Sequence, residues 1–243
     1  MSHPLAAAPA FRETPGIKVC GLIEPAEAVD CLAAGVDWIG LNFHPPSPRF
    51  ASPDRARAVL SACDRADAFV GLFVDRPPAE VAATCRALGL SRVQLHGDEP
   101  PEDLAELADF FLIRAFRLRD ASAVAAMSAY LERAEELGRR PDAVLIDAWS
   151  PSAFGGTGAT ISASLLDDLP PIPRLMLAGG LTPENVAPRA ALVRPWMVDA
   201  ASGVESAPGR KDPAKVRNLV RALRPAMNSR EFPHYPLDSP RSG

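Results

Sequence analysis

Short apolar runs alternate with longer amphipathic segments from residue 17 to residue 224. Eight of the runs have the length and composition of buried strands, and the segments between them have helix-like composition. The predicted strands are 17–20, 38–43, 69–74, 93–95, 111–116, 143–148, 174–178 and 196–200. Repeated strand-then-helix units are typical of a parallel sheet, and eight of them predict one closed (β/α)8 barrel, the TIM barrel.

The segments between the strands carry signals for helix ends. Ser52-Pro53 and Thr182-Pro183 each place an N-cap hydroxyl before a proline at the first helical position. Gly35, Gly89 and Gly138 follow helical stretches, where a C-terminal glycine is expected. The predicted helices include 25–34, 53–65, 79–88, 122–137 and 183–192.

A doubly wound open sheet is the alternative to the barrel. That fold usually shows a glycine-rich fingerprint after its first strand, whereas Cys20-Gly21-Leu22 stands there in this chain. A length of 243 residues suits a single barrel. We therefore expect an N-terminal extension over 1–16, a barrel domain over 17–224, and a flexible proline-rich tail over 225–243.

Composition limits the partners. The net charge is −4 and no long run of one sign occurs, which disfavours nucleic acid and acidic membrane surfaces. The four cysteines and four histidines show no metal-ligand spacing, so no metal is expected. Unpaired thiols suit a reducing compartment, and no segment resembles a signal peptide or a membrane span, so we expect a cytoplasmic protein.

Reactive groups in such barrels stand at the carboxyl ends of the strands and in the loops that follow. Two of these groups could exchange protons with a substrate, because Cys20 ends the first predicted strand and Asp147 lies at the end of the sixth. The candidates selected in this way are Cys20, Asn42, Arg49, Asp75, His96, Asp147, Gly179, Gly180 and Asp199.

Cys20 would act as a base only if its pKa approached the working pH. By strand alternation Lys18 lies on the same side as Cys20, where its ammonium could favour the thiolate or pair with Asp199. We prefer the ion pair, since an unpaired interior charge is costly. The other cysteines, Cys31, Cys63 and Cys85, are expected to be apolar fillers.

Asp147 ends an apolar strand, where a carboxylate gains nothing from packing. Partial burial would raise its pKa and keep a proton available, as a general acid requires. The structural alternative is that Asp147 caps the loop over 149–158.

Two glycine-containing loops could bind phosphate. Gly179 and Gly180 follow the seventh strand, and Ser202 and Gly203 follow the eighth, so backbone amides could approach an anion closely. The glycines could instead only form tight turns, although two such loops on consecutive strands favour phosphate. Lys211, further along, is expected to be a solvated surface residue.

Two further side chains could contact a substrate. Arg49 lies in a stiff proline-rich loop after the second strand, where its guanidinium could clamp a carboxylate at two points. His96 follows the fourth strand, and we expect it to make orienting hydrogen bonds rather than to transfer a proton.

Taken together and in order, the motifs of this chain resemble those of the phosphoribosylanthranilate isomerase family. The resemblance covers about residues 17 to 223. Its motifs are KVCGL at 18–22, PSPRF at 46–50, VQLHG at 93–97, LID at 145–147, GGTG at 155–158, AGGLTPENV at 178–186, VD at 198–199 and SGVE at 202–205.

The resemblance implies a TIM barrel without cofactor or metal that carries out an Amadori rearrangement in tryptophan biosynthesis. N-(5-phosphoribosyl)anthranilate becomes 1-(2-carboxyphenylamino)-1-deoxyribulose 5-phosphate, with Asp147 as the general acid and Cys20 as the base. Arg49 would meet the anthranilate moiety, and the two glycine loops would hold the phosphate. The expected partner is thus a small phosphorylated substrate, and the expected assembly is a monomer or homodimer.

The chain departs from the family pattern at Ile23, Asn42 and Ala201 and over 159–163, without losing a proposed acid, base or clamp. A related aminoaldose isomerase of histidine synthesis is an alternative, but it would favour paired aspartates over Cys20. A non-catalytic barrel that binds a phosphorylated metabolite is a second alternative, which the presence of both Cys20 and Asp147 disfavours.

Overall fold

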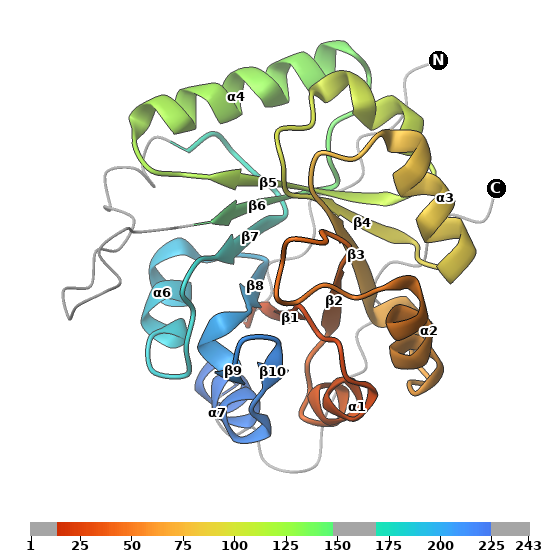
Figure 1. The fold of residues 1–243 in the computed structure, drawn as a ribbon. Helices are drawn as coiled ribbons and strands as arrows, with labels where there is room; N and C mark the ends of the chain where they lie inside the picture. The colour runs from red at the N-terminus through yellow and green to blue at the C-terminus, as the bar shows by residue number, and fades with distance from the viewer. Residues whose placement is uncertain (1–13, 148–168, 225–243) are drawn as a thin grey trace.

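The computed structural model describes residues 14–147 and 169–224 (Figure 1). The predicted tail over 225–243, most of the extension over 1–16, and the loop that Asp147 could cap lie outside the described residues. The last residue of the sixth predicted strand, Ala148, lies outside them as well.

Eight parallel strands form a closed barrel in sequence order, and β8 pairs with β1 to complete it. The predicted TIM barrel is therefore confirmed, and the predicted strands match the observed ones to within a residue or two at each end. The strands are β1 (Gly16–Cys20), β2 (Trp38–Asn42), β3 (Phe69–Phe73), β4 (Arg92–Leu95), β5 (Phe111–Arg117), β6 (Ala143–Asp147), β7 (Leu175–Ala178) and β8 (Met197–Ala200).

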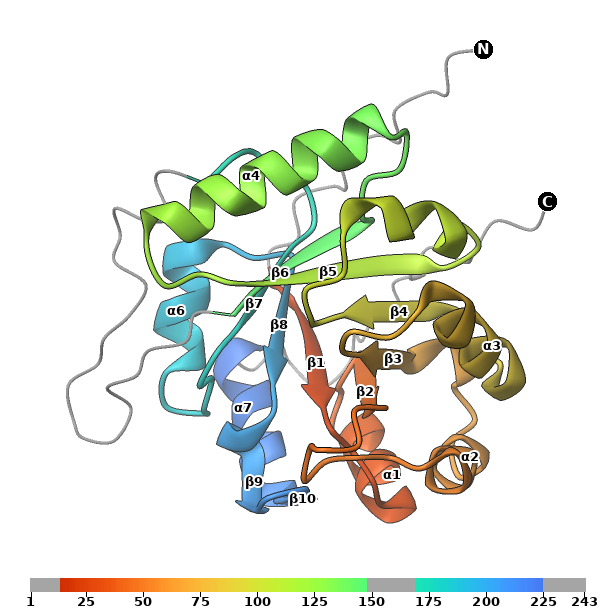
Figure 2. The same cartoon turned by 45° about the horizontal axis from the view of Figure 1, so that its top comes forward.

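Helices surround the strands on the outside of the barrel (Figures 1 and 2). They are α1 (Pro25–Ala33), α2 (Pro53–Ser61), α3 (Pro78–Leu88), α4 (Ala121–Glu136), α6 (Val186–Val193) and α7 (Pro213–Leu223). Ser52 caps α2 as predicted, since its side chain accepts a hydrogen bond from the Arg55 amide. Gly35, Gly89 and Gly138 have positive φ angles of 97°, 68° and 78°, as C-terminal glycines do.

Two predicted helix boundaries are wrong. Helix α2 ends at Ser61 rather than at residue 65, and the short 3₁₀ turn η1 (Ala66–Ala68) leads into β3. Helix α6 begins at Val186 rather than at residue 183. The Asn185 side chain accepts a hydrogen bond from the Thr182 amide, and this local bond forms a turn where helix was expected.

Two further elements follow β4 and β8. A 3₁₀ helix, η2 (Pro101–Leu107), occupies the position between β4 and β5. After β8, the turn η3 (Ser202–Val204) leads into a hairpin of β9 (Glu205–Ala207) and β10 (Arg210–Lys211) that precedes α7.

The core has two parts, because alternate residues of each strand face opposite sides of the barrel wall. The larger cluster joins the outer strand faces to the helices and includes Cys31 and Cys85, as predicted, with Cys63 packed against it. The smaller cluster fills the interior of the barrel and consists of inward-facing strand residues. Its members are Trp38, Val70, Ile113, Ala115, Ala143, Leu145, Met176, Ala178 and Met197, with Phe111 and Trp196 packed against them.

Candidate active site

A buried ion pair joins the first and last strands of the barrel near its mouth, which is the end where the carboxyl ends of the strands lie. Lys18 and Asp199 are register partners on β1 and β8, and the Lys18 Nζ lies 2.8 Å from the Asp199 Oδ2. Burial opposes the ammonium, but the charge and hydrogen bond of Asp199 outweigh it, so the pKa of Lys18 is raised. The predicted pairing of Lys18 with Asp199 is thus confirmed.

Cys20 ends β1 two residues beyond Lys18, on the same side of the strand. Gly40 on β2 makes room for it, since a Cβ at Gly40 would lie only 2.6 Å from the Cys20 Sγ. Burial raises the pKa of the thiol, while the positive charges of Lys18 and Lys211 act in the opposite direction. The site therefore holds a protonated thiol beside two cations that stabilise its thiolate.

Asp147 ends β6 and is partly buried. Its pKa is raised, first by burial and then by the negative charge of Asp199, against a smaller opposing effect of Arg117. The Asp147 Oδ1 is buried, with no hydrogen-bond partner within the described residues. These surroundings favour the protonated carboxyl, as predicted from its position at the end of a buried strand.

Arg117 is a residue of the mouth that the sequence reasoning missed. It is the last residue of β5 and the register partner of Asp147 on β6. The guanidinium is exposed, and its Nη2 donates a hydrogen bond of 3.2 Å to the His96 carbonyl. Extending the alternation of the inward-facing Ile113 and Ala115 by one more step would have found it, but the predicted strand stopped at residue 116.

His96 follows β4 and is oriented by Gln94, whose Nε2 lies 2.9 Å from the His96 Nδ1. Burial, together with the charges of Arg117, Lys18 and Arg114, lowers the pKa of His96 to about 4. The imidazole is therefore neutral at neutral pH, a state that suits hydrogen bonding better than proton donation.

Arg49 forms a bidentate ion pair with a carboxylate of its own chain. Its Nε and Nη2 lie 2.7 Å from the two carboxylate oxygens of Glu205. The loop that carries Arg49 is held by Asn42, whose amide donates to the Ser47 hydroxyl and accepts from the His44 amide. Asn42, a departure from the family pattern, thus shapes the arginine loop.

Lys211 is not the solvated surface residue that was expected. Its side chain is 1 % exposed, and its Nζ lies 2.7 Å from Glu205 and 3.2 Å from the Ala201 carbonyl oxygen. The backbone of β10 brings it inward, because the Lys211 amide donates to Glu27 on α1. That hairpin had no signal in the strand and helix pattern.

The loop after β7 turns through Gly179 and Gly180, with φ angles of 95° and 59°. Arg189 and Asn185 donate to the carbonyl oxygens of these two glycines. In a trans peptide the C=O and N–H groups point in opposite directions. The amides of Gly180 and Leu181, which follow these carbonyls, therefore face away from Arg189 and Asn185. Apart from Gly180 and its two chain neighbours, no described residue has an atom within 4 Å of the position of a Gly180 Cβ, so space is open beside the loop.

The loop after β8 packs directly on the loop after β7. A Cβ at Gly203 would collide with the Leu181 carbonyl oxygen, so only glycine allows this approach. Ser202 and Gly203 belong to η3, in the same turn. The two predicted phosphate loops therefore lie together, as their positions on neighbouring strands require.

Asp75, selected as a strand-end candidate, joins two loops instead. Its Oδ1 accepts a hydrogen bond of 2.6 Å from the Asp98 amide, and its own amide donates to Glu99. Glu99 also accepts from the Gly97 amide and lies 3.4 Å from Arg114. These contacts fix the loop after β3 against the loop after β4.

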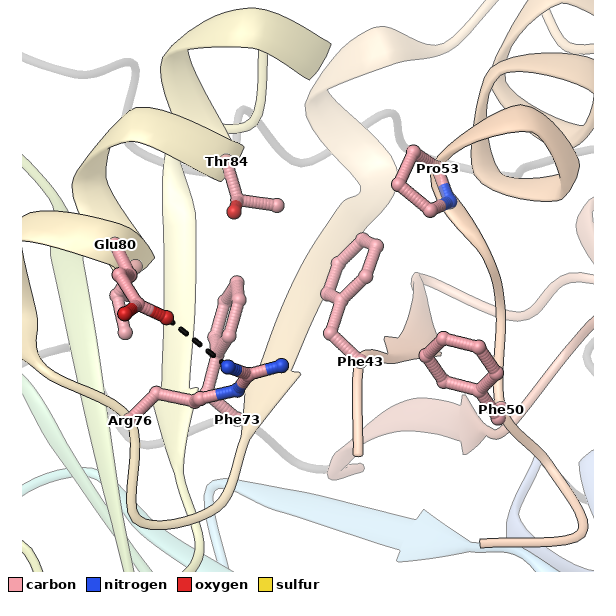
Figure 3. Close-up of a pocket in the computed structure, with 8 residues that line it drawn as sticks. Phe43, Phe50, Pro53, Phe73, Arg76, Glu80 and Thr84 are labelled. Atoms are coloured by element: carbon pink, nitrogen blue, oxygen red, sulfur yellow. Dashed lines mark hydrogen bonds and ion pairs between the residues drawn. The ribbon is translucent and has the colours of Figure 1, made fainter. Parts of the chain in front are cut away.

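A pocket of about 130 Å³ lies between the α2 and α3 sides of the barrel (Figure 3). Among its lining residues, Phe43 and Phe73 stack with ring centroids 5.1 Å apart, and Arg76 pairs with Glu80. The lining residues are Phe43, Phe50, Pro53, Phe73, Arg76, Glu80, Val81 and Thr84. None of the predicted site residues lines this pocket, so it is separate from the acid–base groups.

Residues 14–147 and 169–224 contain no group of three or more His, Cys, Asp or Glu side chains able to hold a metal ion. No helix in this part of the chain combines the length and the apolar character needed to cross a membrane.

The sequence model of one protein family, N-(5'phosphoribosyl)anthranilate (PRA) isomerase, matches residues 17–222. The chain belongs to the N-(5'-phosphoribosyl)anthranilate isomerase family. This membership confirms the predicted family, the assignment to tryptophan biosynthesis and the isomerase class, in preference to the histidine-pathway and non-catalytic alternatives.

Known relatives agree in sequence and in structure. The isomerase of Geobacter sulfurreducens is 42% identical over 205 residues, which cover 84% of this chain and 96% of that protein. The crystal structure of the Thermotoga maritima phosphoribosyl anthranilate isomerase superposes with a TM-score of 0.74 at 30% identity, covering 86% of this chain and 98% of that one. A second crystal structure, of a phosphoribosyl anthranilate isomerase in complex with reduced 1-(o-carboxyphenylamino)-1-deoxyribulose 5-phosphate, superposes with a TM-score of 0.71 at 28% identity, covering 86% and 98%.

Proposed function

We propose that this chain converts N-(5'-phosphoribosyl)anthranilate into 1-(2-carboxyphenylamino)-1-deoxyribulose 5-phosphate, with Asp147 as the general acid and Cys20 as the general base. The observation that carries this proposal is the pair of proton-exchanging side chains at the carboxyl ends of β1 and β6 in one barrel. The family membership supplies the substrate.

Asp147 begins the reaction by donating its proton to the ribose ring oxygen. The bond between that oxygen and the first sugar carbon breaks, and the nitrogen lone pair forms the C=N bond of a protonated Schiff base. The raised pKa of Asp147 supports this role, because a carboxyl that stays protonated has a proton to give. The carboxylate left behind is stabilised by the positive charge of Arg117 across the strand register.

Cys20 then removes the proton from the second sugar carbon. The electrons of the C–H bond form a C=C bond while those of the C=N bond return to nitrogen, which gives an enolamine that tautomerises to the ketone. The positive charges of Lys18 and Lys211 lower the cost of the thiolate that this step needs.

The remaining groups bind and orient the substrate. The loops containing Gly179, Gly180, Ser202 and Gly203 hold the phosphate, with open space beside Gly180 to receive it. Arg49 meets the anthranilate carboxylate, and neutral His96 orients the substrate through hydrogen bonds. Fixing the substrate at both ends places its reacting carbons between acid and base.

The proposal extends to the compartment and the assembly of the enzyme. We propose a cytoplasmic enzyme, in keeping with four free cysteines, that acts as a monomer or homodimer and has no nucleic acid partner. One solved structure shows monomers generated from the dimeric Thermotoga maritima isomerase, so that relative is known in both states.

Anthranilate fluorescence tests the proposal. Freshly prepared phosphoribosylanthranilate is mixed with the purified protein, and emission is followed over time against the spontaneous decay of the substrate. We expect a decay that is faster in proportion to protein concentration. A rate equal to the spontaneous one at every protein concentration would refute the proposed activity.

A further inference from the structure

Glu205 connects two parts of the mouth that lie far apart in the sequence. Its carboxylate is 5 % exposed and accepts both hydrogen bonds of the Arg49 fork. It also lies 2.7 Å from the Lys211 Nζ and accepts from the Gly209 amide. Burial opposes its ionisation, but the hydrogen bonds from Arg49 and Lys211 outweigh it, so the pKa of Glu205 is lowered and the group is charged at neutral pH.

The geometry of this fork restricts what Arg49 can offer a substrate. A guanidinium has an edge formed by Nε and one terminal nitrogen, and Glu205 occupies this edge of Arg49. The second terminal nitrogen, Nη1, is not part of this edge, so the pairing with Glu205 leaves its N–H groups for other partners. Arg49 also crosses the end of β1, since a Cβ at Gly21 would lie 2.5 Å from the Arg49 Cδ. Glu205 therefore fixes the guanidinium beside Cys20.

The same carboxylate anchors the loop after β8. Glu205 directly follows the η3 turn that contains Ser202 and Gly203. Lys211 ties the two together, because its Nζ binds both the Glu205 carboxylate and the Ala201 carbonyl oxygen. One buried carboxylate is thus shared by the arginine of the β2 loop and the phosphate loop of β8.

We propose that Glu205 is a positioning residue that sets the distance between the Arg49 guanidinium and the phosphate loop after β8, so that a substrate with a carboxylate at one end and a phosphate at the other spans both. This inference rests on the proposed function for the identity of the two anions. It assigns Glu205 no proton transfer, and it predicts an effect on ligands that carry both groups.

The test compares two probes by calorimetry. Reduced 1-(o-carboxyphenylamino)-1-deoxyribulose 5-phosphate carries both anions, whereas inorganic phosphate carries one. In Glu205→Gln we expect the Kd of the first to rise about tenfold or more, as for loss of a charge-assisted hydrogen-bond pair, and that of phosphate to change by less than about threefold. In Arg49→Met the further change Glu205→Gln should have little added effect on the preference for the two-anion probe, because Arg49, the partner through which Glu205 acts on the ligand carboxylate, is already absent.

Glu27→Gln is the matched control. Glu27 is also a buried carboxylate that binds the hairpin, through Arg210 and the Lys211 amide, but it does not contact Arg49. We expect its probe affinities to stay near those of the unaltered protein. Arg49→Lys provides a second variant that keeps the charge and loses the fork, in case Glu205→Gln does not fold, and it should weaken the two-anion probe selectively.

Three results would overturn the inference: equal weakening of both probes in Glu205→Gln, full additivity of Glu205→Gln with Arg49→Met, or the same selective loss in Glu27→Gln. Binding does not require turnover, so the fluorescence assay of the unaltered protein decides the proposed function separately. A protein that turns over substrate but gives any of these results keeps its function and loses this role for Glu205.

Discussion

Cys20 and Asp147 carry the proposed chemistry from similar environments with opposite requirements. Burial raises the pKa of both side chains, which favours the uncharged carboxyl and the uncharged thiol. That state is useful for Asp147, which donates a proton, and unhelpful for Cys20, which must accept one. The positive charges of Lys18 and Lys211 beside the thiol partly correct this mismatch.

The pH dependence of kcat/KM should reflect this arrangement. The productive form has Asp147 protonated and Cys20 ionised, although the carboxyl has the lower pKa of the two. Below the pKa of Asp147 both groups are protonated, so no thiolate is present and the rate should fall. Above the pKa of Cys20 both groups are ionised, so no protonated carboxyl is present and the rate should fall again. The apparent pKa of the acid limb should be above that of an ordinary aspartate, and the apparent pKa of the alkaline limb above that of an ordinary cysteine, because both pKa values are raised.

The fluorescence assay across pH measures this profile. Asp147→Glu, which keeps a carboxyl on a longer side chain, should retain a bell shape with a shifted acid limb. An acid limb at or below the ordinary pKa of aspartate in the unaltered enzyme would contradict the assignment of Asp147.

At the residue scale, the sequence placed Cys20 and Asp147 correctly at the ends of their strands, but it did not place the groups that depend on loops. Cys20 and Asp147 follow directly from where apolar runs stop. Glu205 and Lys211 depend on a short hairpin whose register no local pattern specifies. Arg117 could have been found by alternation, since it continues the inward face of β5.

At the scale of elements, the two glycine loops act as one unit. Gly203 allows the loop after β8 to contact the Leu181 carbonyl, while Arg189 on α6 and Asn185 just before it donate to the carbonyls of Gly179 and Gly180. Helix α6 begins only after Asn185, so this residue lies in the preceding turn, where its side chain binds the Gly180 carbonyl. Capping signals alone could not distinguish that turn from a helix start.

Gly180→Ala and Gly138→Ala form a matched pair of substitutions. Both glycines have positive φ, 59° and 78°, and no described residue other than the chain neighbours has an atom within 4 Å of either Cβ position. Each substitution should cost a similar backbone strain, about 1–2 kcal/mol, in urea unfolding. Only Gly180→Ala places a methyl group in the space assigned to phosphate, so only this variant should show a higher KM.

Inhibition by inorganic phosphate provides the second measurement for this pair. It should weaken in Gly180→Ala and stay unchanged in Gly138→Ala. Equal phosphate inhibition in the two variants would place the phosphate elsewhere.

At the scale of the whole molecule, the barrel closes where Lys18 on β1 meets Asp199 on β8. Both side chains are buried, at 0% and 7% exposure, so each charge depends on the other for compensation. The sequence suggested this pair through alternation and the cost of an unpaired interior charge. The repeated strand-then-helix pattern predicted the closed barrel itself, because only a few topologies satisfy it.

Lys18→Met should destabilise the fold by about 3–5 kcal/mol, because it leaves the Asp199 carboxylate buried without its partner. Urea unfolding at neutral pH measures the loss. The double variant Lys18→Met/Asp199→Leu removes both charges and should recover much of the stability. A single variant as stable as the unaltered protein would show that the pair does not hold the barrel closed.

The central claim is that Asp147 gives a proton and Cys20 takes one. Turnover of fresh phosphoribosylanthranilate by Cys20→Ala and Asp147→Asn, followed by the loss of anthranilate fluorescence, tests it most directly. Each variant should remain folded by circular dichroism and lose about 10²–10⁴-fold in kcat, the usual contribution of a general acid or base. Near-normal kcat in either folded variant would contradict the role assigned to that residue.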